Sequence, residues 1–271
     1  MIKLVVADMD GTSLGANESI STKNVETILK VLDSGREFAF ASGRPTFGMK
    51  NLIKNAGLEK KIRYFIAYNG GTVCDTQLNK NIYAKNLNFD IIKKIYNLII
   101  ENNFDISFCL HEKNLIYISR DTSELEMEVE SNKQTKVFIK NIDELKNTEF
   151  MKILLVGKRK NLEKAREEIK KSNVSPYVKI MFSLDQLLEI IPFDSDKCVA
   201  LKWFSEHLGI PLQEILTIGD GENDIEMLKM AGFSAAMNNA YDSVKKNADY
   251  VTKSPNTEDG LTEAIKHFIK L

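Results

Sequence analysis

Two aspartates follow an apolar run near the start of the chain, two positions apart. Residues 2–7 predict a strand that is buried on both faces of a parallel sheet, and Asp8 and Asp10 come directly after it. Side chains at positions i and i+2 of an extended chain point to the same side, so the two carboxylates can converge on one small ligand. Their repulsion favours a bound cation such as Mg²⁺, or else raises the pKa of one of them. Either arrangement is useful for acid–base or metal chemistry.

A second group of acidic side chains follows another predicted strand. Residues 214–219 lead into Asp220, which is followed by Gly-Glu-Asn and Asp224, directly before a helix predicted over 225–231. In open α/β sheets ligands bind outside the carboxyl ends of the strands, and neighbouring parallel strands place those ends side by side. We therefore expect Asp220 and Asp224 to lie beside Asp8, where a metal ion would offset their repulsion.

Polar residues at one further strand end and a lysine at the start of a helix complete the set. Ser42, Gly43 and Arg44 follow a predicted strand at 37–41, where a hydroxyl hydrogen and the amides of the next helix favour an anion. Lys197 lies in the first turn of a predicted helix, where a cation is unfavourable against the helix dipole unless an acidic partner is near. A carboxylate nucleophile, a second carboxylate, an anion site, a lysine and a cation site are what phosphoryl transfer through an aspartyl-phosphate requires.

The order of elements predicts how these residues are positioned. Strands and helices alternate up to residue 84, which is typical of a doubly wound parallel sheet of the Rossmann-like α/β class. From residue 85 hairpins followed by helices predict an α+β unit, and the strand–helix pattern then returns. We expect a core domain of residues 1–84 and 189–271 with an inserted domain of residues 85–188.

Composition excludes several classes of function. The 271 residues are 43% hydrophobic and 28% charged, with a net charge of −1, so no overall charge favours nucleic acid or an anionic membrane. No apolar segment approaches the roughly 20 residues that span a bilayer. The three cysteines form no Cys-x-x-Cys pair, which argues against a disulfide framework or a zinc site and favours a reducing cytoplasm.

In this order the motifs resemble those of the haloacid dehalogenase-like hydrolase superfamily, and most closely its Cof-type subfamily of sugar-phosphate phosphatases. The resemblance covers nearly the whole chain. It rests on Asp8-Met9-Asp10-Gly11-Thr12, Ser42-Gly43-Arg44, Lys197 and Gly219-Asp220-Gly221-Glu222-Asn223-Asp224, supported by Tyr68-Asn69-Gly70-Gly71, Met237-Asn238-Asn239-Ala240 and Glu258-Asp259-Gly260-Leu261. Ser13, Cys198 and Asn238 depart from the residues usual in that subfamily, and none of them replaces a catalytic group.

The resemblance implies a magnesium-dependent phosphatase that acts on small phosphorylated metabolites, such as sugar phosphates, pyridoxal phosphate or flavin mononucleotide. It implies that Asp8 is the nucleophile and Asp10 the general acid and base, while Lys197 neutralises charge. The inserted domain would be a C2-type cap that closes over the site and selects the substrate. It also implies that Mg²⁺ is bound by Asp8, the Asp10 carbonyl and Asp220, with Asp224 in or near that set. Ser42, Gly43 and Asn223 would bind the phosphoryl group. Arg44 and Asn69 would contact the substrate or brace the loop.

Two alternatives remain open at this stage. A phosphomutase or phosphotransferase would hand the phosphoryl group of the same aspartyl-phosphate to a sugar hydroxyl rather than to water. A non-enzymatic module would only store phosphate on Asp8, although it would have no use for a cap or for Asp10. We expect a cytoplasmic monomer or weak homodimer whose partner is a small metabolite, with no nucleic acid or membrane partner.

Overall fold

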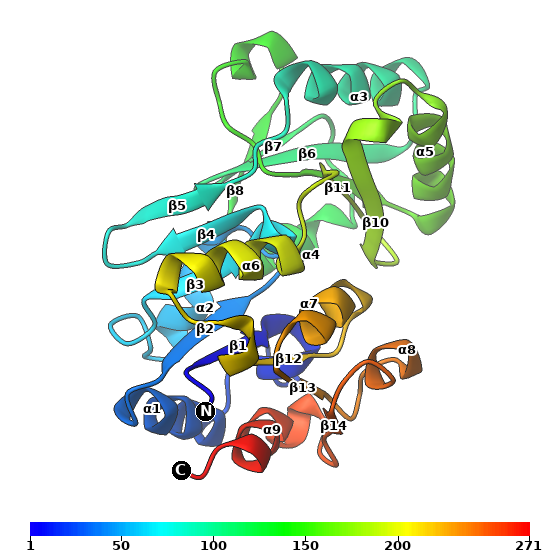
Figure 1. Ribbon diagram of the computed structural model, residues 1–271. Coiled ribbons are helices and arrows are strands. Elements are labelled where there is room, and N and C mark those ends of the chain that lie inside the picture. Colours follow the sequence, from blue (N-terminus) through cyan, green and yellow to red (C-terminus); the bar gives the residue numbers. More distant parts are fainter. The chain divides into compact units, whose positions relative to one another are not determined.

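The computed structural model describes residues 1–271 and divides into two compact units (Figure 1). The core unit comprises Met1–Arg44, Met49–Tyr83 and Asp196–Leu271, and the inserted unit comprises Pro45–Gly48 and Ala84–Ser195. The boundary expected after residue 188 falls inside a strand, Leu187–Pro192, that pairs within the sheet of the inserted unit. The inserted unit therefore includes the whole of this strand, and it continues to Ser195.

An eight-stranded sheet forms the centre of the core unit, in the order β14-β13-β12-β1-β2-β3-β4-β5. The pairs from β14 to β3 are all parallel, β4 is antiparallel to β3, and β1 lies between β12 and β2. This order confirms the predicted α/β class. The strands are β1 (Leu4–Asp8), β2 (Glu37–Ala41), β3 (Tyr64–Ala67), β4 (Thr72–Asp75), β5 (Lys80–Ala84), β12 (Ile215–Gly219), β13 (Phe233–Ala236) and β14 (Tyr250–Val251).

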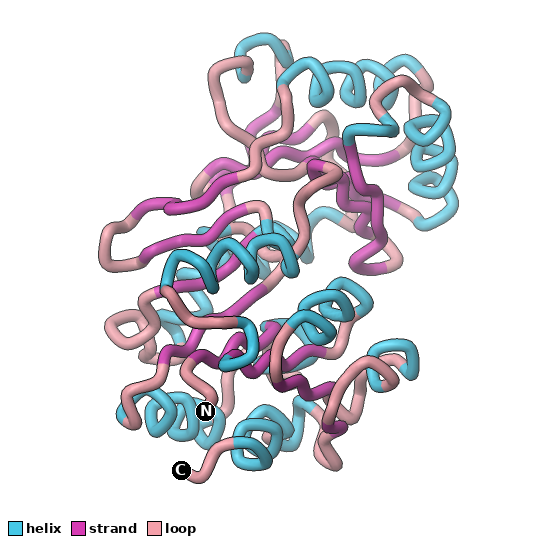
Figure 2. Tube along the Cα trace, viewed as in Figure 1, coloured by secondary structure: helices cyan, strands magenta, loops and turns pink.

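Helices lie on both sides of this sheet (Figure 2). Leu4 and Val6 of β1 share one hydrophobic cluster with Leu201 of α6 and Met227 of α7, and all five residues of β1 are buried, those facing the other way included. Both faces of β1 are thus covered, which explains why its sequence shows no alternation of apolar and polar residues. The helices are α1 (Thr22–Asp33), α2 (Thr46–Asn55), α6 (Lys197–Leu208), α7 (Ile225–Met230), α8 (Asp242–Lys245) and α9 (Gly260–Phe268).

The inserted unit is built on a six-stranded sheet in the order β10-β11-β9-β6-β7-β8, which is antiparallel except for the β7–β8 pair. The strands are β6 (Ile106–Glu112), β7 (Leu115–Ile118), β8 (Thr135–Phe138), β9 (Ile153–Gly157), β10 (Val178–Leu184) and β11 (Leu187–Pro192), and the helices are α3 (Phe89–Glu101), α4 (Leu125–Asn132) and α5 (Arg159–Lys171). The mixture of hairpins and helices confirms the predicted α+β character.

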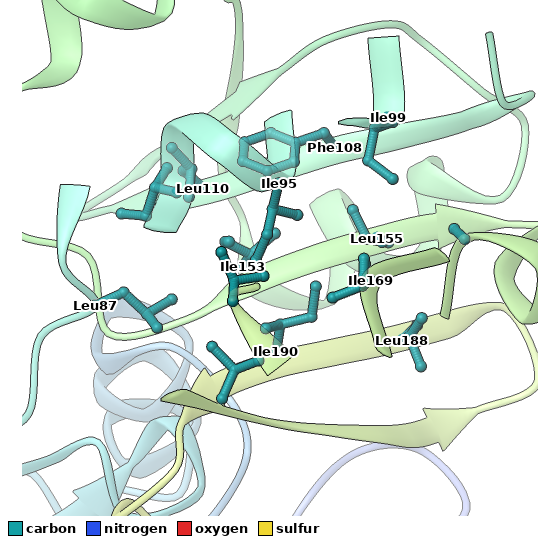
Figure 3. Packing of buried hydrophobic residues seen from close by; sticks show 14 of the residues in the cluster. Leu87, Ile95, Ile99, Phe108, Leu110, Ile153, Leu155, Ile169, Leu188 and Ile190 are labelled. Carbon is teal, nitrogen blue, oxygen red and sulfur yellow. The ribbon is translucent and has the colours of Figure 1, made fainter. Parts of the chain in front are cut away.

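Alternate residues of the strands in the inserted unit face two different hydrophobic clusters. Phe108 and Leu155 pack with Ile95 of α3 and Ile169 of α5 (Figure 3). The next residues along those strands pack instead with Leu125 of α4. Apolar residues that recur every second position in the strands thus pack against apolar residues that recur about every 3.6 positions in the helices. In neither unit does any helix combine the length and apolar character that crossing a membrane requires.

Candidate active site

The carboxylate of Asp8 lies at the buried carboxyl end of β1 and forms an ion pair with Lys197. Lys197 is the first residue of α6, and its ammonium group donates to Oδ1 of Asp8 and, at 2.7 Å, to Oδ1 of Asp224. Asp224 is fully buried in the one-turn helix that follows β12. One buried cation therefore joins two carboxylates that are far apart in the sequence. These are the acidic partners that a lysine in a first helical turn needs.

The ionisable groups around Asp8 perturb one another strongly. Burial raises the pKa of Asp8 well above its usual range; Lys197 opposes this, whereas Asp224, Asp220 and Asp10 add to it. Burial also raises the pKa of Asp220 to about 6. For Lys197 burial alone would lower the pKa, but the charges of Asp224 and Asp8 outweigh it, so its pKa is raised. The site thus holds more negative charge than one ammonium group can balance.

Asp220 contacts the turn that follows β1. Its Oδ1 accepts a hydrogen bond of 2.7 Å from the hydroxyl of Thr12. Gly11 has a φ of 77°, and a Cβ on it would lie 2.2 Å from Oδ2 of Asp220. Both the left-handed backbone and the close approach require glycine here. The turn after β1 therefore packs directly against the acidic end of β12.

Asp10 is held by the turn after β2. Its Oδ1 accepts from Nε and Nη2 of Arg44 at 2.9 and 2.6 Å, and its Oδ2 accepts from Nε of Arg44 at 3.0 Å. The buried hydroxyl of Ser42 donates to the same Oδ2 at 3.1 Å. Although Asp8 and Asp10 are two positions apart, they use different partners, because Lys197 contacts only the first of them.

Amide side chains join the turns that follow β2, β3 and β12. Asn69 adopts a left-handed conformation, with a φ of 51°. Its main-chain amide donates to the carbonyl of Ser42 at 2.9 Å, and its Oδ1 accepts from Nδ2 of Asn223 at 2.8 Å. A Cβ on Gly43 would lie 2.9 Å from Nδ2 of Asn69. Three separate turns are thereby held together around one asparagine.

Gly70 allows the start of α6 to approach the turn after β3. It has a φ of 91°, and a Cβ at this position would lie 2.0 Å from the carbonyl oxygen of Asp196. Asp196 caps α6, because its side chain accepts from the amide of Val199 at 2.8 Å. This contact fixes the helical turn that carries Lys197. All the residues predicted for the site thus lie at the carboxyl edge of the core sheet or at the start of α6: Asp8, Asp10, Ser42, Gly43, Arg44, Asn69, Lys197, Asp220, Asn223 and Asp224.

Sequence reasoning gave no role to the side chains of Thr12, Asn239 and Asn256, which brace the turn after β1. Nδ2 of Asn239 donates to the carbonyl of Gly11 at 2.8 Å, and its Oδ1 accepts from the amide of Asn256 at 2.9 Å. Nδ2 of Asn256 in turn donates to the carbonyl of Leu14 at 2.7 Å. The motif Met237-Asn238-Asn239-Ala240 indicates that Asn239 has a role. It does not show that the side-chain amide donates a hydrogen bond to the carbonyl of Gly11.

Glu263 of α9 anchors the segment that leads to Asn256. Its Oε1 accepts from the hydroxyl of Tyr250 at 2.6 Å and the amide of Lys253 at 2.8 Å, and its Oε2 accepts from the amide of Ser254 at 2.9 Å. Burial alone would raise the pKa of Glu263, but these hydrogen bonds outweigh it and lower the pKa to about 2. The carboxylate therefore stabilises the fold only while it is ionised.

We expect Glu263→Gln to lower the melting temperature by about 3 °C at neutral pH, and less in acid. The carboxyl has a pKa of about 2 in the folded protein against 4.5 in the free group, so its stabilisation is present above pH 4.5 and is lost as the pH falls towards 2. Thermal unfolding of both proteins between about pH 6 and about pH 3 tests this expectation. Glu226→Gln, which removes a surface carboxylate of α7, is the control. A pH-independent difference would contradict the assignment.

A divalent cation fits beside Asp8 and Asp220. One carboxylate oxygen from each of Asp8, Asp220 and Asp224 lies within 4.8 Å of the other two. Oxygen donors with excess negative charge suit a hard cation such as Mg²⁺. Asp224 already uses both of its oxygens, because Oδ1 accepts from Lys197 and Oδ2 accepts from the amides of Asp220 and Gly221 at 3.1 and 3.0 Å. Asp8 and Asp220 are therefore the better candidates for direct ligands, with Asp224 fixing their surroundings.

Gly11→Ala is expected to weaken magnesium binding by about 10-fold or more, because its methyl group would displace Asp220. Gly35→Ala is a matched control, since Gly35 has a φ of 79° but no atom within 4 Å of a Cβ. Both variants should lose about 1 kcal/mol of unfolding free energy to backbone strain. Titration calorimetry with MgCl₂ measures the difference between them. Equal magnesium affinities in the two variants would show that the approach of Gly11 to Asp220 does not shape the cation site.

The chain belongs to the haloacid dehalogenase-like hydrolase family, whose sequence model matches residues 5–265. A haloacid dehalogenase-like hydrolase from Bacteroides thetaiotaomicron of known crystal structure is 29% identical, with a TM-score of 0.91 over 99% of this chain and 100% of that one. The family and the motifs together confirm the predicted resemblance to the Cof-type subfamily. The protein is accordingly an enzyme of the phosphoric monoester hydrolase class.

Two curated relatives carry the names of different phosphatases. The 5-amino-6-(5-phospho-D-ribitylamino)uracil phosphatase YcsE of Bacillus subtilis is 29% identical over 268 residues, which cover 99% of this chain and 96% of the relative. The HMP-PP phosphatase of Yersinia pseudotuberculosis is 27% identical over 246 residues, which cover 91% of this chain and 87% of the relative. What these relatives share by name is phosphatase activity, while the compounds they are named for differ.

Proposed function

We propose that this protein is a magnesium-dependent phosphatase that hydrolyses small phosphorylated metabolites through an aspartyl-phosphate on Asp8. The observation that carries the proposal is the buried ion pair of Asp8 with Lys197, beside the carboxylate of Asp220. Phosphate monoesters resist uncatalysed hydrolysis strongly, and a carboxylate that attacks one must overcome the repulsion between two anions. Lys197 holds a fixed positive charge where that repulsion would arise.

The ligands proposed for Mg²⁺ are the carboxylates of Asp8 and Asp220 and the main-chain carbonyl of Asp10, with Asp224 in or near the set. A bound magnesium ion would neutralise charge on the phosphoryl group and orient it. The remaining phosphoryl oxygens would be held by the hydroxyl of Ser42, the amide of Gly43 and the side chain of Asn223. These donors sit at the ends of different strands, so the phosphoryl group would be bound from several sides.

The reaction would proceed in two steps. In the first, a carboxylate oxygen of Asp8 bonds to phosphorus while the bond from phosphorus to the leaving oxygen breaks, and the carboxyl group of Asp10 gives its proton to that oxygen. In the second, Asp10 takes a proton from water as the water oxygen bonds to phosphorus and the bond to Asp8 breaks. Phosphate leaves, and both aspartates return to their starting protonation states.

The inserted unit is proposed to act as a C2-type cap that selects the leaving group. The two curated relatives are named for different compounds, so a shared phosphoryl site in the core unit and a variable selecting unit would account for both names. Sugar phosphates are the proposed substrates, with pyridoxal phosphate and flavin mononucleotide as further candidates. The three cysteines are free thiols, which fits the reducing cytoplasm as the proposed location.

Phosphate release from a panel of compounds tests the proposal. The panel contains sugar phosphates, pyridoxal phosphate, flavin mononucleotide and p-nitrophenyl phosphate, each with MgCl₂ and with EDTA. Release that requires magnesium supports the phosphatase, and the ranking identifies the substrate class. Transfer of phosphate between positions of a sugar, dependent on a bisphosphate activator, would instead favour a phosphomutase. No turnover of any compound, together with a long-lived phosphorylated Asp8, would favour the phosphate-storing module.

A further inference from the structure

Both carboxylate oxygens of Asp10 are engaged by the turn after β2. The guanidinium of Arg44 donates to each of them, at 2.6 to 3.0 Å, in a side-on contact that uses Nε and Nη2. Such a two-pronged contact fixes the plane of a carboxylate as well as its position. The side chain of Arg44 is only 12% exposed, whereas that of Asp10 is 49% exposed. The arginine, which is the less exposed of the two residues, therefore orients the aspartate.

Arg44 is itself held in place by surrounding groups. Its amide donates to Oγ of Ser42 at 3.1 Å, and its carbonyl accepts from the amide of Tyr68 at 3.0 Å. Its Nη2 also lies 3.5 Å from Oε1 of Glu18. The backbone and the guanidinium are thus both fixed. An arginine restrained in this way can hold a partner in one orientation without losing much side-chain entropy when it does so.

Ser42 links this contact to the binding of a phosphoryl group. Its hydroxyl carries one hydrogen, which it donates to Oδ2 of Asp10 at 3.1 Å. In the proposed function the same hydroxyl donates to a phosphoryl oxygen, and it cannot donate to both acceptors. A bound phosphoryl group would therefore take the hydrogen of Ser42 away from Asp10. Arg44 would then be the residue that keeps Asp10 in position.

The two oxygens of Asp10 would then have different roles. Oδ1 accepts two hydrogen bonds from Arg44, at 2.9 and 2.6 Å, while Oδ2 accepts one from it at 3.0 Å. Once Ser42 has turned to the phosphoryl group, Oδ2 is the oxygen that can carry the proton for the leaving group. A general acid must meet the leaving oxygen at hydrogen-bond distance, and a misplacement of about 1 Å can cost roughly 100-fold in rate.

We propose that Arg44 is a positioning residue that orients the general acid Asp10 for proton transfer, and that it does not act by binding the substrate. This inference rests on the proposed function. In the step concerned, the proton on Oδ2 of Asp10 moves to the leaving oxygen as the bond from phosphorus to that oxygen breaks and the bond from phosphorus to Asp8 forms. Arg44 exchanges no proton and no bond. Its entire effect on the rate passes through Asp10.

A double-mutant cycle tests this dependence. Arg44→Gln is made alone and together with Asp10→Asn. Release of the sugar from a sugar phosphate is measured in single turnovers with enzyme in excess, and KM and kcat are measured separately in the steady state. We expect Arg44→Gln alone to lower the rate by about 10- to 100-fold, with KM changed by less than about 3-fold. In the Asp10→Asn background it should cause almost no further loss, because the residue it positions has already been disabled.

Two further comparisons sharpen the result. The loss in Arg44→Gln should be smaller for p-nitrophenyl phosphate, whose weakly basic leaving group needs little protonation. Arg44→Lys, which keeps the charge but not the two-pronged contact, should resemble Arg44→Gln, and it replaces that variant in the cycle if the glutamine protein does not fold. Arg63→Gln is the matched control, because Arg63 contacts Asp75 through Nε and Nη2, both at 3.1 Å. Its kinetics should equal those of the wild type.

The possible results separate this inference from the function on which it rests. If the losses from Arg44→Gln and Asp10→Asn multiply, or if KM rises about 10-fold while kcat is kept, Arg44 binds substrate and the inference is wrong. Those results require an active wild-type enzyme, so they leave the proposed function intact. A wild-type protein that releases no phosphate from any compound overturns both.

Discussion

Asp8→Asn is expected to lower phosphate release by more than about 10⁴-fold while the fold is retained. An amide oxygen is a far poorer nucleophile than a carboxylate, and the proposed reaction offers no other group to attack phosphorus. Little loss of stability is expected, because burial and the carboxylates around Asp8 raise its pKa and so make its charge unfavourable. Lys197 also keeps its second contact, to Asp224 at 2.7 Å.

The measurement compares wild type and Asp8→Asn with the best substrate of the panel. Trapping of the phosphoenzyme from a ³²P-labelled substrate adds a second readout, because the label should bind covalently to the wild type and not to the variant. Asp33→Asn, which changes an exposed aspartate at the end of α1, is the control for a general effect of replacing an aspartate. An Asp8→Asn protein that retains a tenth or more of the activity would exclude the aspartyl-phosphate mechanism.

The strand ends are the part of the site that the sequence predicts best. Buried parallel strands have a strong signature: residues 4–7 are apolar, residues 215–219 contain no charged side chain, and each run is followed directly by an aspartate. Once β1 and β12 are neighbours, Asp8 and Asp220 must lie close together. The predicted gathering of polar residues at one edge of the sheet therefore follows from topology alone, with no knowledge of side-chain conformations.

The partners of individual side chains could not be predicted in the same way. Asp8 and Asp10 each contact a cation, and the choice of Lys197 for one and Arg44 for the other depends on side-chain conformations that the spacing in the sequence does not set. The same is true of Asp224, whose oxygens are all used by Lys197 and two main-chain amides. Spacing in the sequence shows that such groups converge, but it carries no information on which hydrogen bond forms.

The boundary of the inserted unit shows a different limit of sequence reasoning. Residues 187–192 are apolar enough to belong to either sheet, and their pairing with β9 and β10 assigns them to the inserted unit. A strand is placed by its hydrogen-bonded neighbours, which are distant in the sequence. The bracing of Gly11 and Leu14 by Asn239 and Asn256 is hidden for the same reason, because residues more than two hundred positions apart form it.

Lys197→Met is expected to reduce kcat by about 10³-fold or more and also to lower stability, which distinguishes it from Asp8→Asn. Lys197 is fully buried, and its removal leaves Asp8 and Asp224 buried without their cation. Loss of one member of a buried ion pair typically costs about 3–5 kcal/mol. Methionine has a similar length, so lost packing should add little. Lys202→Met, at an exposed position of the same helix, is the control.

Magnesium provides a readout for Lys197→Met that does not depend on activity. Without the ammonium group, the carboxylates of Asp8, Asp220 and Asp224 carry more uncompensated charge, so the variant should bind Mg²⁺ more tightly than the wild type does. A ligand that binds only the folded state raises the melting temperature in proportion to the logarithm of its concentration over its Kd. Added MgCl₂ should therefore raise the melting temperature of Lys197→Met more than that of the wild type or of Lys202→Met. An equal rise in all three would mean that Lys197 and the cation do not share the same carboxylates.

The kinetic part of the prediction is tested by the kcat of Lys197→Met. A value within about 10-fold of the wild type would mean that the charge of Lys197 is not needed for phosphoryl transfer.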